Sequence, residues 1–105
     1  MTIREEVRAF ADLGPLPPEN TASESDIRQA QQRLEAIKRP VSRDEVVLLI
    51  ESFGQDTCFG LAWTLLHLIE SGPNPAVRTE PTDDASEWIK LLWRRTQHTH
   101  RQSPT

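Results

Sequence analysis

Hydrophobic residues recur every three or four positions along most of this chain, which is the spacing of an amphipathic α-helix. No window of more than four residues alternates strictly between apolar and polar residues, so the pattern predicts no strand. Glycines, prolines and capping residues divide the periodic stretches into five expected helices. These span about residues 2–13, 23–38, 42–53, 56–71 and 84–95. The pattern therefore predicts an all-α fold, a compact five-helix bundle of antiparallel helical hairpins.

Capping boxes are expected at the starts of the first, third and fifth helices. In such a box a side chain and a carboxylate three residues later bind each other's backbone amides. The three pairs are Thr2 with Glu5, Ser42 with Glu45, and Asp84 with Glu87. Pro40 ends the second helix only two residues before Ser42, which makes the intervening turn short. We therefore expect residues 24–53 to form an antiparallel helical hairpin.

Most of the apolar residues fall in the last three expected helices. Residues 46–53 are apolar around most of the circumference, so this helix is expected to be central. Trp63 is expected in the core, where its truncation would unfold or nearly unfold the domain. After Trp93 the sequence holds no apolar residue. A single helical domain of residues 1–95 and a disordered polar tail of residues 96–105 are thus predicted.

The length of 105 residues is that of one domain and excludes multidomain enzymes and full dinucleotide-binding folds. No apolar run is long enough to span a membrane, and the start lacks the apolar core of a secretory signal. The single cysteine, Cys58, lies in an apolar run without basic neighbours, so we interpret it as a buried small hydrophobe. These features favour a cytoplasmic location.

Charge is unevenly distributed along the chain, whose formal net charge is −4. Residues 1–93 contain 9 basic and 16 acidic residues, and the remaining residues add three arginines, Arg94, Arg95 and Arg101. An acidic body repels nucleic acid and favours a basic protein partner. A nucleic-acid-associated regulator that uses the arginine-rich tail is therefore one alternative, and a disfavoured one.

The best candidate for enzyme chemistry is His67 with Glu70, three positions apart on the fourth expected helix. Such a pair can share a metal ion, as in di-iron helical bundles. The order of the two residues is reversed here and the motif occurs once, so we expect no metal and no other cofactor. A small metal-dependent enzyme that uses His67 and Glu70 is the second alternative.

Gly60 is the one glycine expected inside a helix. An internal glycine costs about 1 kcal/mol relative to alanine, and close approach of another helix is the usual reason. With Thr64, His67 and Ser71 it forms a strip of small and polar residues. We interpret this strip as a helix crossing, or alternatively as a place where a partner docks.

The segment 52–70, from Ser52-Phe53-Gly54 through Asp56 to Glu70, resembles a paired-helix unit of the HEAT-like kind. With the following proline loop and tryptophan-rich helix, it is also similar to small bacterial helical proteins, among them immunity proteins of toxin systems. The resemblance covers about residues 40–95 and implies protein binding, with no catalytic residues. The chain holds at most two helical pairs, so a compact bundle is expected instead of an extended solenoid.

The sequence thus favours a non-enzymatic module, an acidic immunity or regulatory protein that binds and neutralises a basic toxin or enzyme. The candidate partner-binding residues are acidic caps, exposed acids and the strip on the fourth helix. They are Glu45, Glu51, Asp56, Gly60, Thr64, His67, Glu70, Asp83, Asp84 and Glu87.

Overall fold

The described part of the chain folds into five α-helices. The computed structural model describes residues 3–54, 56–73, 76–77 and 79–102, with residues 96–102 described by their backbone alone. The helices are α1 (Glu5–Ala11), α2 (Glu24–Glu35), α3 (Arg43–Ile50), α4 (Leu61–Glu70) and α5 (Glu87–Gln102). No residue in these ranges forms a strand. The predicted all-α class is confirmed.

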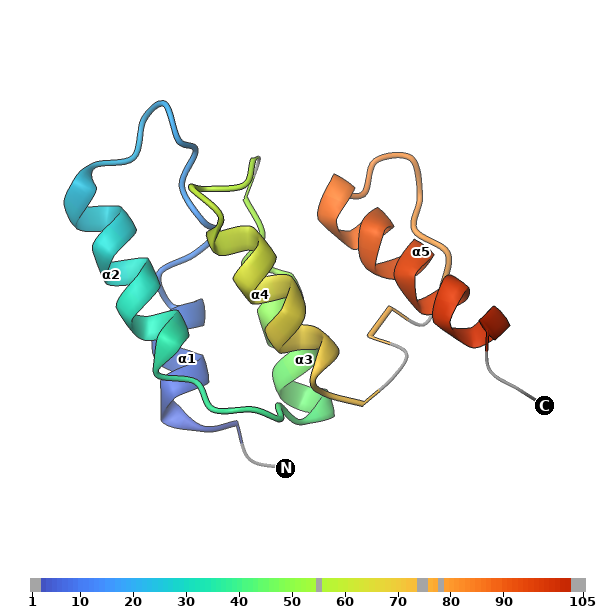
Figure 1. Cartoon of the computed structure of the whole chain (residues 1–105). Coiled ribbons are helices and arrows are strands. Elements are labelled where there is room, and N and C mark those ends of the chain that lie inside the picture. Colours follow the sequence, from blue (N-terminus) through green and yellow to red (C-terminus); the bar gives the residue numbers. More distant parts are fainter. Residues whose placement is uncertain (1–2, 55, 74–75, 78, 103–105) are drawn as a thin grey trace.

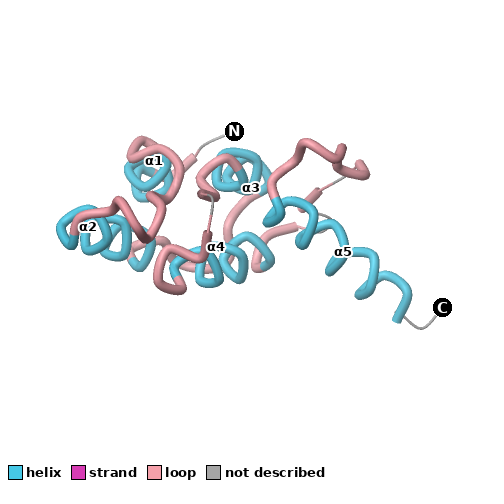
Figure 2. The backbone as a smooth tube through the Cα atoms, turned by 90° about the horizontal axis from the view of Figure 1, so that it is seen from above, coloured by secondary structure: helices cyan, strands magenta, loops and turns pink. Residues whose placement is uncertain are grey.

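The first four helices form two layers, and α5 lies to one side of them. Seen from above, α1 and α3 occupy one layer, and α2 and α4 the other (Figure 2). Successive helices from α1 to α4 run in opposite directions, so the loops 12–23 and 51–60 gather at the same end of the molecule (Figure 1). With α5 projecting at the side, the molecule measures 47 × 31 × 20 Å.

The core fills the space between the two layers. α4 contributes most to it, because six of its ten residues are buried. The other helices contribute fewer side chains, and the core continues into the loops through Leu16, Ile37, Val41 and Phe53. Each large apolar side chain buried here contributes about 1.5 to 3 kcal/mol. α4 is thus the most deeply buried helix. α3, which was expected to be central, packs on both α1 and α4 but leaves Val47 60% exposed.

The expected hairpin of residues 24–53 does not form. α2 packs on α1, where the Arg33 guanidinium donates to the Ala9 carbonyl at 2.8 Å, and α3 packs on α1 and α4. The reason lies in the α2–α3 connection, which buries Ile37 and Val41 as it crosses the lower end of the molecule (Figure 1). Burial of these two side chains holds the connection on the core, so that α3 begins away from α2.

Two of the expected capping arrangements differ in the structure. The box of Ser42 with Glu45 is confirmed, and α2 has a second box, formed by Ser23 and Asp26. α1 instead begins at Glu5 with Arg4 as its N-cap, and Thr2 lies outside the described residues. The predicted cap of α5 at Asp84 is wrong. Asp84 lies in a turn, and α5 begins only at Glu87. The hydroxyl of the preceding Ser86 accepts from the Ile89 amide at 3.2 Å.

Three aromatic rings fasten α5 to the body. The Trp88 ring stacks on Phe53 at 5.4 Å between centroids, and Trp63 meets it edge-on at 5.0 Å. Trp63 itself is 42% exposed, so the prediction that it is a core residue is wrong.

The backbone of α5 continues to Gln102, whereas the sequence predicted disorder after residue 95. Residues 96–102 contain neither glycine nor proline, so no helix breaker interrupts the run before Pro104. Residues 103–105 of the expected tail lie outside the described residues.

Candidate functional site

The ten predicted partner-binding residues do not form one surface. Four of the acids take part in intramolecular ion pairs or loop hydrogen bonds, although the Glu87 side chain stays exposed. Glu45 pairs with Arg4, Glu70 with Arg95 and Glu87 with Lys90, and Asp56 binds backbone amides. Glu51, Asp83 and Asp84 are exposed, on the end of α3 and in the turn before α5. The proposed acidic binding face is thus divided among separate elements.

Glu45 is the clearest correction, because its side chain is only 2% exposed. The carboxylate accepts from Nε and Nη2 of Arg4 at 3.0 and 3.1 Å, from the Arg4 amide at 3.0 Å and from the Ser42 amide at 2.8 Å. The Arg4 hydrogen bond, assisted by those of the two amides, lowers the pKa of Glu45 to about 2. Glu45 therefore joins α1 to α3 and is inaccessible to a partner.

His67 and Glu70 also lack the arrangement of a metal site. His67 is exposed, and the Glu70 carboxylate accepts from Nε and Nη2 of Arg95 at 2.6 and 2.9 Å. Across the described part of the chain, no three His, Cys, Asp or Glu side chains gather closely enough to hold a metal ion. The ion pair between Glu70 and Arg95 engages one of the three arginines of the expected basic end. The Arg101 side chain is outside the described set.

Gly60 does not lie inside a helix. It is the N-cap of α4, with a left-handed φ of 89°, and a Cβ added to it would meet nothing within 4 Å. The interpretation of the strip as a helix crossing is therefore wrong, since Thr64 and His67 are both exposed on the surface of α4. The glycine is needed here for its backbone conformation.

The turn before α4 has an unusual backbone. Cys58 and Phe59 also have positive φ angles, of 47° and 54°, so three successive residues are left-handed. This conformation costs about 1 to 3 kcal/mol for each non-glycine residue unless surrounding groups stabilise it. We call residues 58–60 the left-handed turn.

Two carboxylates hold the left-handed turn in place. The Glu19 carboxylate accepts from the Thr57 hydroxyl and the Phe59 amide, both at 2.7 Å. The Asp56 carboxylate accepts from the Cys58 amide at 2.9 Å and from the Glu19 amide at 3.0 Å. These bonds fix the loop 51–60 to the loop 12–23, so Asp56 has a structural role.

The left-handed turn buries one side chain and exposes the next. Cys58 is fully buried, as predicted, and burial together with the nearby Asp56 and Glu19 raises the pKa of its thiol. Phe59 is 63% exposed. The sequence did not predict this, because Phe59 falls in an apolar run assigned to a helix. The signal was Gly60, a residue type that favours left-handed backbone.

Phe59 borders a shallow groove along one flank of α2, with a volume of about 400 Å³. The other lining residues come from the start of α2 and the residue before its cap. They are Ala22, Glu24, Ile27, Arg28 and Gln31. We call this the Phe59 groove.

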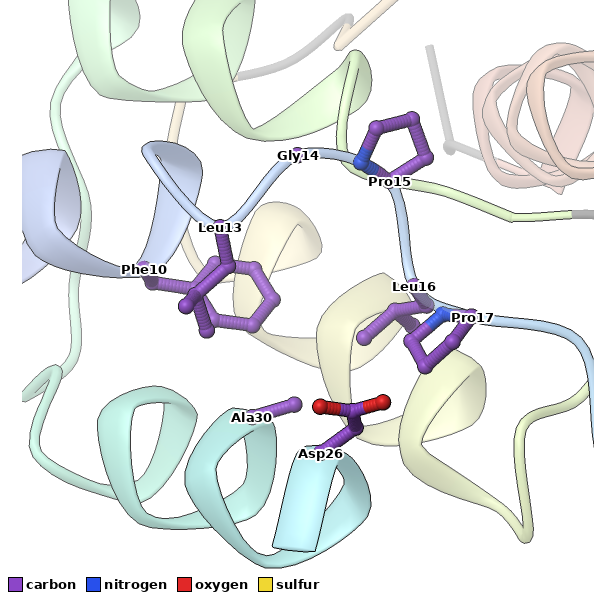
Figure 3. Close-up of a pocket in the computed structure, with 8 residues that line it drawn as sticks. All are labelled: Phe10, Leu13, Gly14, Pro15, Leu16, Pro17, Asp26 and Ala30. Carbon is purple, nitrogen blue, oxygen red and sulfur yellow. The ribbon is translucent and has the colours of Figure 1, made fainter. Parts of the chain in front are cut away.

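A second depression lies on the opposite flank of α2, with a volume of about 230 Å³ (Figure 3). Phe10, Leu13 and Ala30 lie on one side of it and the segment Gly14–Pro17 on another, and the Asp26 carboxylate is turned toward Leu16 and Pro17. We call the segment Gly14–Pro17 the strap and this depression the strap hollow. The two depressions together with the left-handed turn make up what we call the loop end. This end of the molecule is the candidate functional site.

No protein-family model matches this sequence, and comparisons with curated proteins and with solved structures find no significant match. Among the helices described, none is both long and apolar enough to cross a membrane.

Proposed function

We propose that this protein is a non-enzymatic binding module that engages a basic partner protein through its loop end. The supporting observation is Phe59, a large apolar side chain that is 63% exposed on a turn held by four hydrogen bonds. The Phe59 ring contributes little to the core, although burying such a ring would stabilise the fold by about 1.5 to 3 kcal/mol. A partner that covers the ring would recover this free energy.

The left-handed turn makes Phe59 a good anchor for binding. Binding energy at protein interfaces is concentrated in a few aromatic or arginine side chains that become buried in pockets. Ordering a flexible residue reduces affinity, whereas a residue that is already held in place avoids this cost. Phe59 is held by the Glu19 carboxylate and borders a groove that can receive an apolar side chain of the partner.

The acidic surplus of the body supports a basic partner. Residues 1–93 carry seven more acidic than basic residues, and such a charge raises the rate of association with a cationic protein. The sequence favours one form of this proposal, an immunity or regulatory protein of HEAT-like type. Such a protein would act on a basic toxin or enzyme in the cytoplasm. The buried, unpaired Cys58 is compatible with that location.

Affinity capture with matched variants tests the proposal. Val47 is a suitable control, because it is 60% exposed but lies on α3. We expect the wild-type protein and Val47→Ala to retain one basic protein in stoichiometric amounts, and Phe59→Ala to lose it. Retention of the same protein by Phe59→Ala, or the absence of any stoichiometric protein, would contradict the proposal.

A further inference from the structure

The strap hollow combines an apolar wall with a single charged group. Of its eight lining residues, only Asp26 carries a charge, and the others offer aromatic, aliphatic, glycine or proline surface. Figure 3 shows the Asp26 carboxylate facing Leu16 and Pro17 across the opening. A ligand for this site must therefore have an apolar part for the wall and a group that complements a carboxylate.

The strap has no free hydrogen-bond donor to offer a ligand. The amides of Leu13, Gly14 and Leu16 donate to the carbonyls of Phe10, Ala11 and Ser52, respectively. Pro15 and Pro17 have no N–H. The lining side chains include no donor either, because an ionised aspartate only accepts. The strap hollow thus offers acceptors to a ligand, and an anion would find no donor on this wall.

The surroundings of the Asp26 carboxylate leave room for a cationic partner. This carboxylate accepts from the Ser23 amide at 3.4 Å, and no basic side chain pairs with it in the part of the chain that the structure describes. The amino-terminal end of α2 carries the equivalent of about half a positive charge from the helix dipole. One full negative charge exceeds this, so a cation remains favoured at the hollow.

We infer that the strap hollow receives a lysine or arginine side chain of the bound partner, an inference that rests on the proposed function. These side chains have an apolar stem of three or four methylenes and a cationic head that donates hydrogen bonds. The stem lies against Leu13 and Pro17, and the head reaches the Asp26 carboxylate. The volume of about 230 Å³ suits one side chain. It is below the roughly 300 to 1,000 Å³ typical of sites for whole small molecules.

Titration of the full chain with small probes tests this inference by amide NMR spectroscopy. The probes are the Nα-acetyl amides of lysine and of norleucine, which share an apolar stem and differ in the ammonium group. We expect the lysine probe to shift the amides of residues 13, 14, 16, 26 and 30 and to bind about fivefold more tightly than the norleucine probe. Equal binding of the two probes, or shifts located elsewhere, would overturn the inference.

Asp26→Asn removes the charge while it keeps an oxygen that can accept from the Ser23 amide. We expect this variant to bind the lysine probe about fivefold more weakly, with norleucine binding unchanged. Asp84→Asn is the matched control, because Asp84 is exposed in the turn before α5. Unchanged lysine binding by Asp26→Asn would contradict the assignment.

The titration uses no partner protein, so its outcome is separate from that of affinity capture. If capture depends on Phe59 but the lysine probe shows no preference for the hollow, the proposed function stands and this inference fails. If the probe binds at Asp26 but Phe59→Ala retains the partner, the proposed function fails, and the hollow remains a site for basic side chains.

Discussion

Glu45 and Arg4 form an ion pair that joins α3 to the start of α1. Because the pKa of Glu45 is about 2 in the folded chain and near 4.5 in the unfolded chain, its contribution to stability is complete above about pH 4.5. This contribution is lost as the pH falls through 2. We expect Glu45→Gln to reduce the free energy of unfolding by about 2 kcal/mol at pH 7. The variant should also lose less stability than the wild type between pH 4.5 and 2.

Urea unfolding at a series of pH values measures both effects. Glu51→Gln is the control, since Glu51 is exposed at the end of α3. It should unfold like the wild type throughout. Identical pH profiles for the two glutamine variants would show that the buried pair does not stabilise the fold.

Gly54 and Gly60 differ in why they are glycines. A Cβ at Gly54 would collide with the carbonyl oxygen of Leu16, whereas one at Gly60 would project into open space at positive φ. We expect Gly54→Ala to destabilise by about 3 kcal/mol, because the strap must move. Gly60→Ala should cost about 1 kcal/mol, from backbone strain alone. Thermal unfolding of both variants would rank them, and a larger loss for Gly60→Ala would contradict this account.

The structural role of a single residue was predictable from sequence where it depends on residues nearby in the chain. The capping box of Ser42 and Glu45 depends on residues three apart, and it is present in the structure. Burial of Glu45 depends on Arg4, 41 positions away, so no local pattern could predict it. The exposure of Phe59 similarly depends on Glu19, 40 positions away.

At the scale of elements, the Trp88 ring contributes more than any other aromatic ring to holding α5 against the body. Trp88 is 8% exposed between two aromatic rings, whereas Trp63 is 42% exposed. We expect Trp88→Ala to cost about 3 to 5 kcal/mol and to release α5, and Trp63→Ala to cost only about 1 kcal/mol. Thermal unfolding followed by circular dichroism measures the difference. A greater loss for Trp63→Ala would mean that α5 docks differently.

The number and type of helices were predictable because apolar spacing and caps lie within each helix. The sequence did not predict which helices pack together. A short connection favoured pairing of α2 with α3, but the buried Ile37 and Val41 send the chain across to α1 and α4. Burial of loop residues is a property of the whole core, and it leaves no periodic signal in the sequence.

For the whole molecule, the acidic surplus is expected to act on the rate of binding. The captured partner should associate about tenfold more slowly when the ionic strength is raised from about 0.05 to about 0.5 M, because salt screens long-range attraction. Stopped-flow mixing of the two proteins measures this rate. An association rate that does not change with salt would contradict the proposal of a basic partner.

The loop end could not be predicted as a site, since it assembles two loops and one helix that are separate in the sequence. We propose that Phe59, in this loop end, anchors the partner. Calorimetric titration of the captured protein with Phe59→Ala and Val47→Ala tests this most directly. We predict a loss of affinity of about thirtyfold for Phe59→Ala, the effect of removing an interface anchor worth about 2 kcal/mol. Val47→Ala should bind like the wild type, with unfolding temperatures unchanged in both variants. Equal affinity of the two variants for the partner would contradict the account.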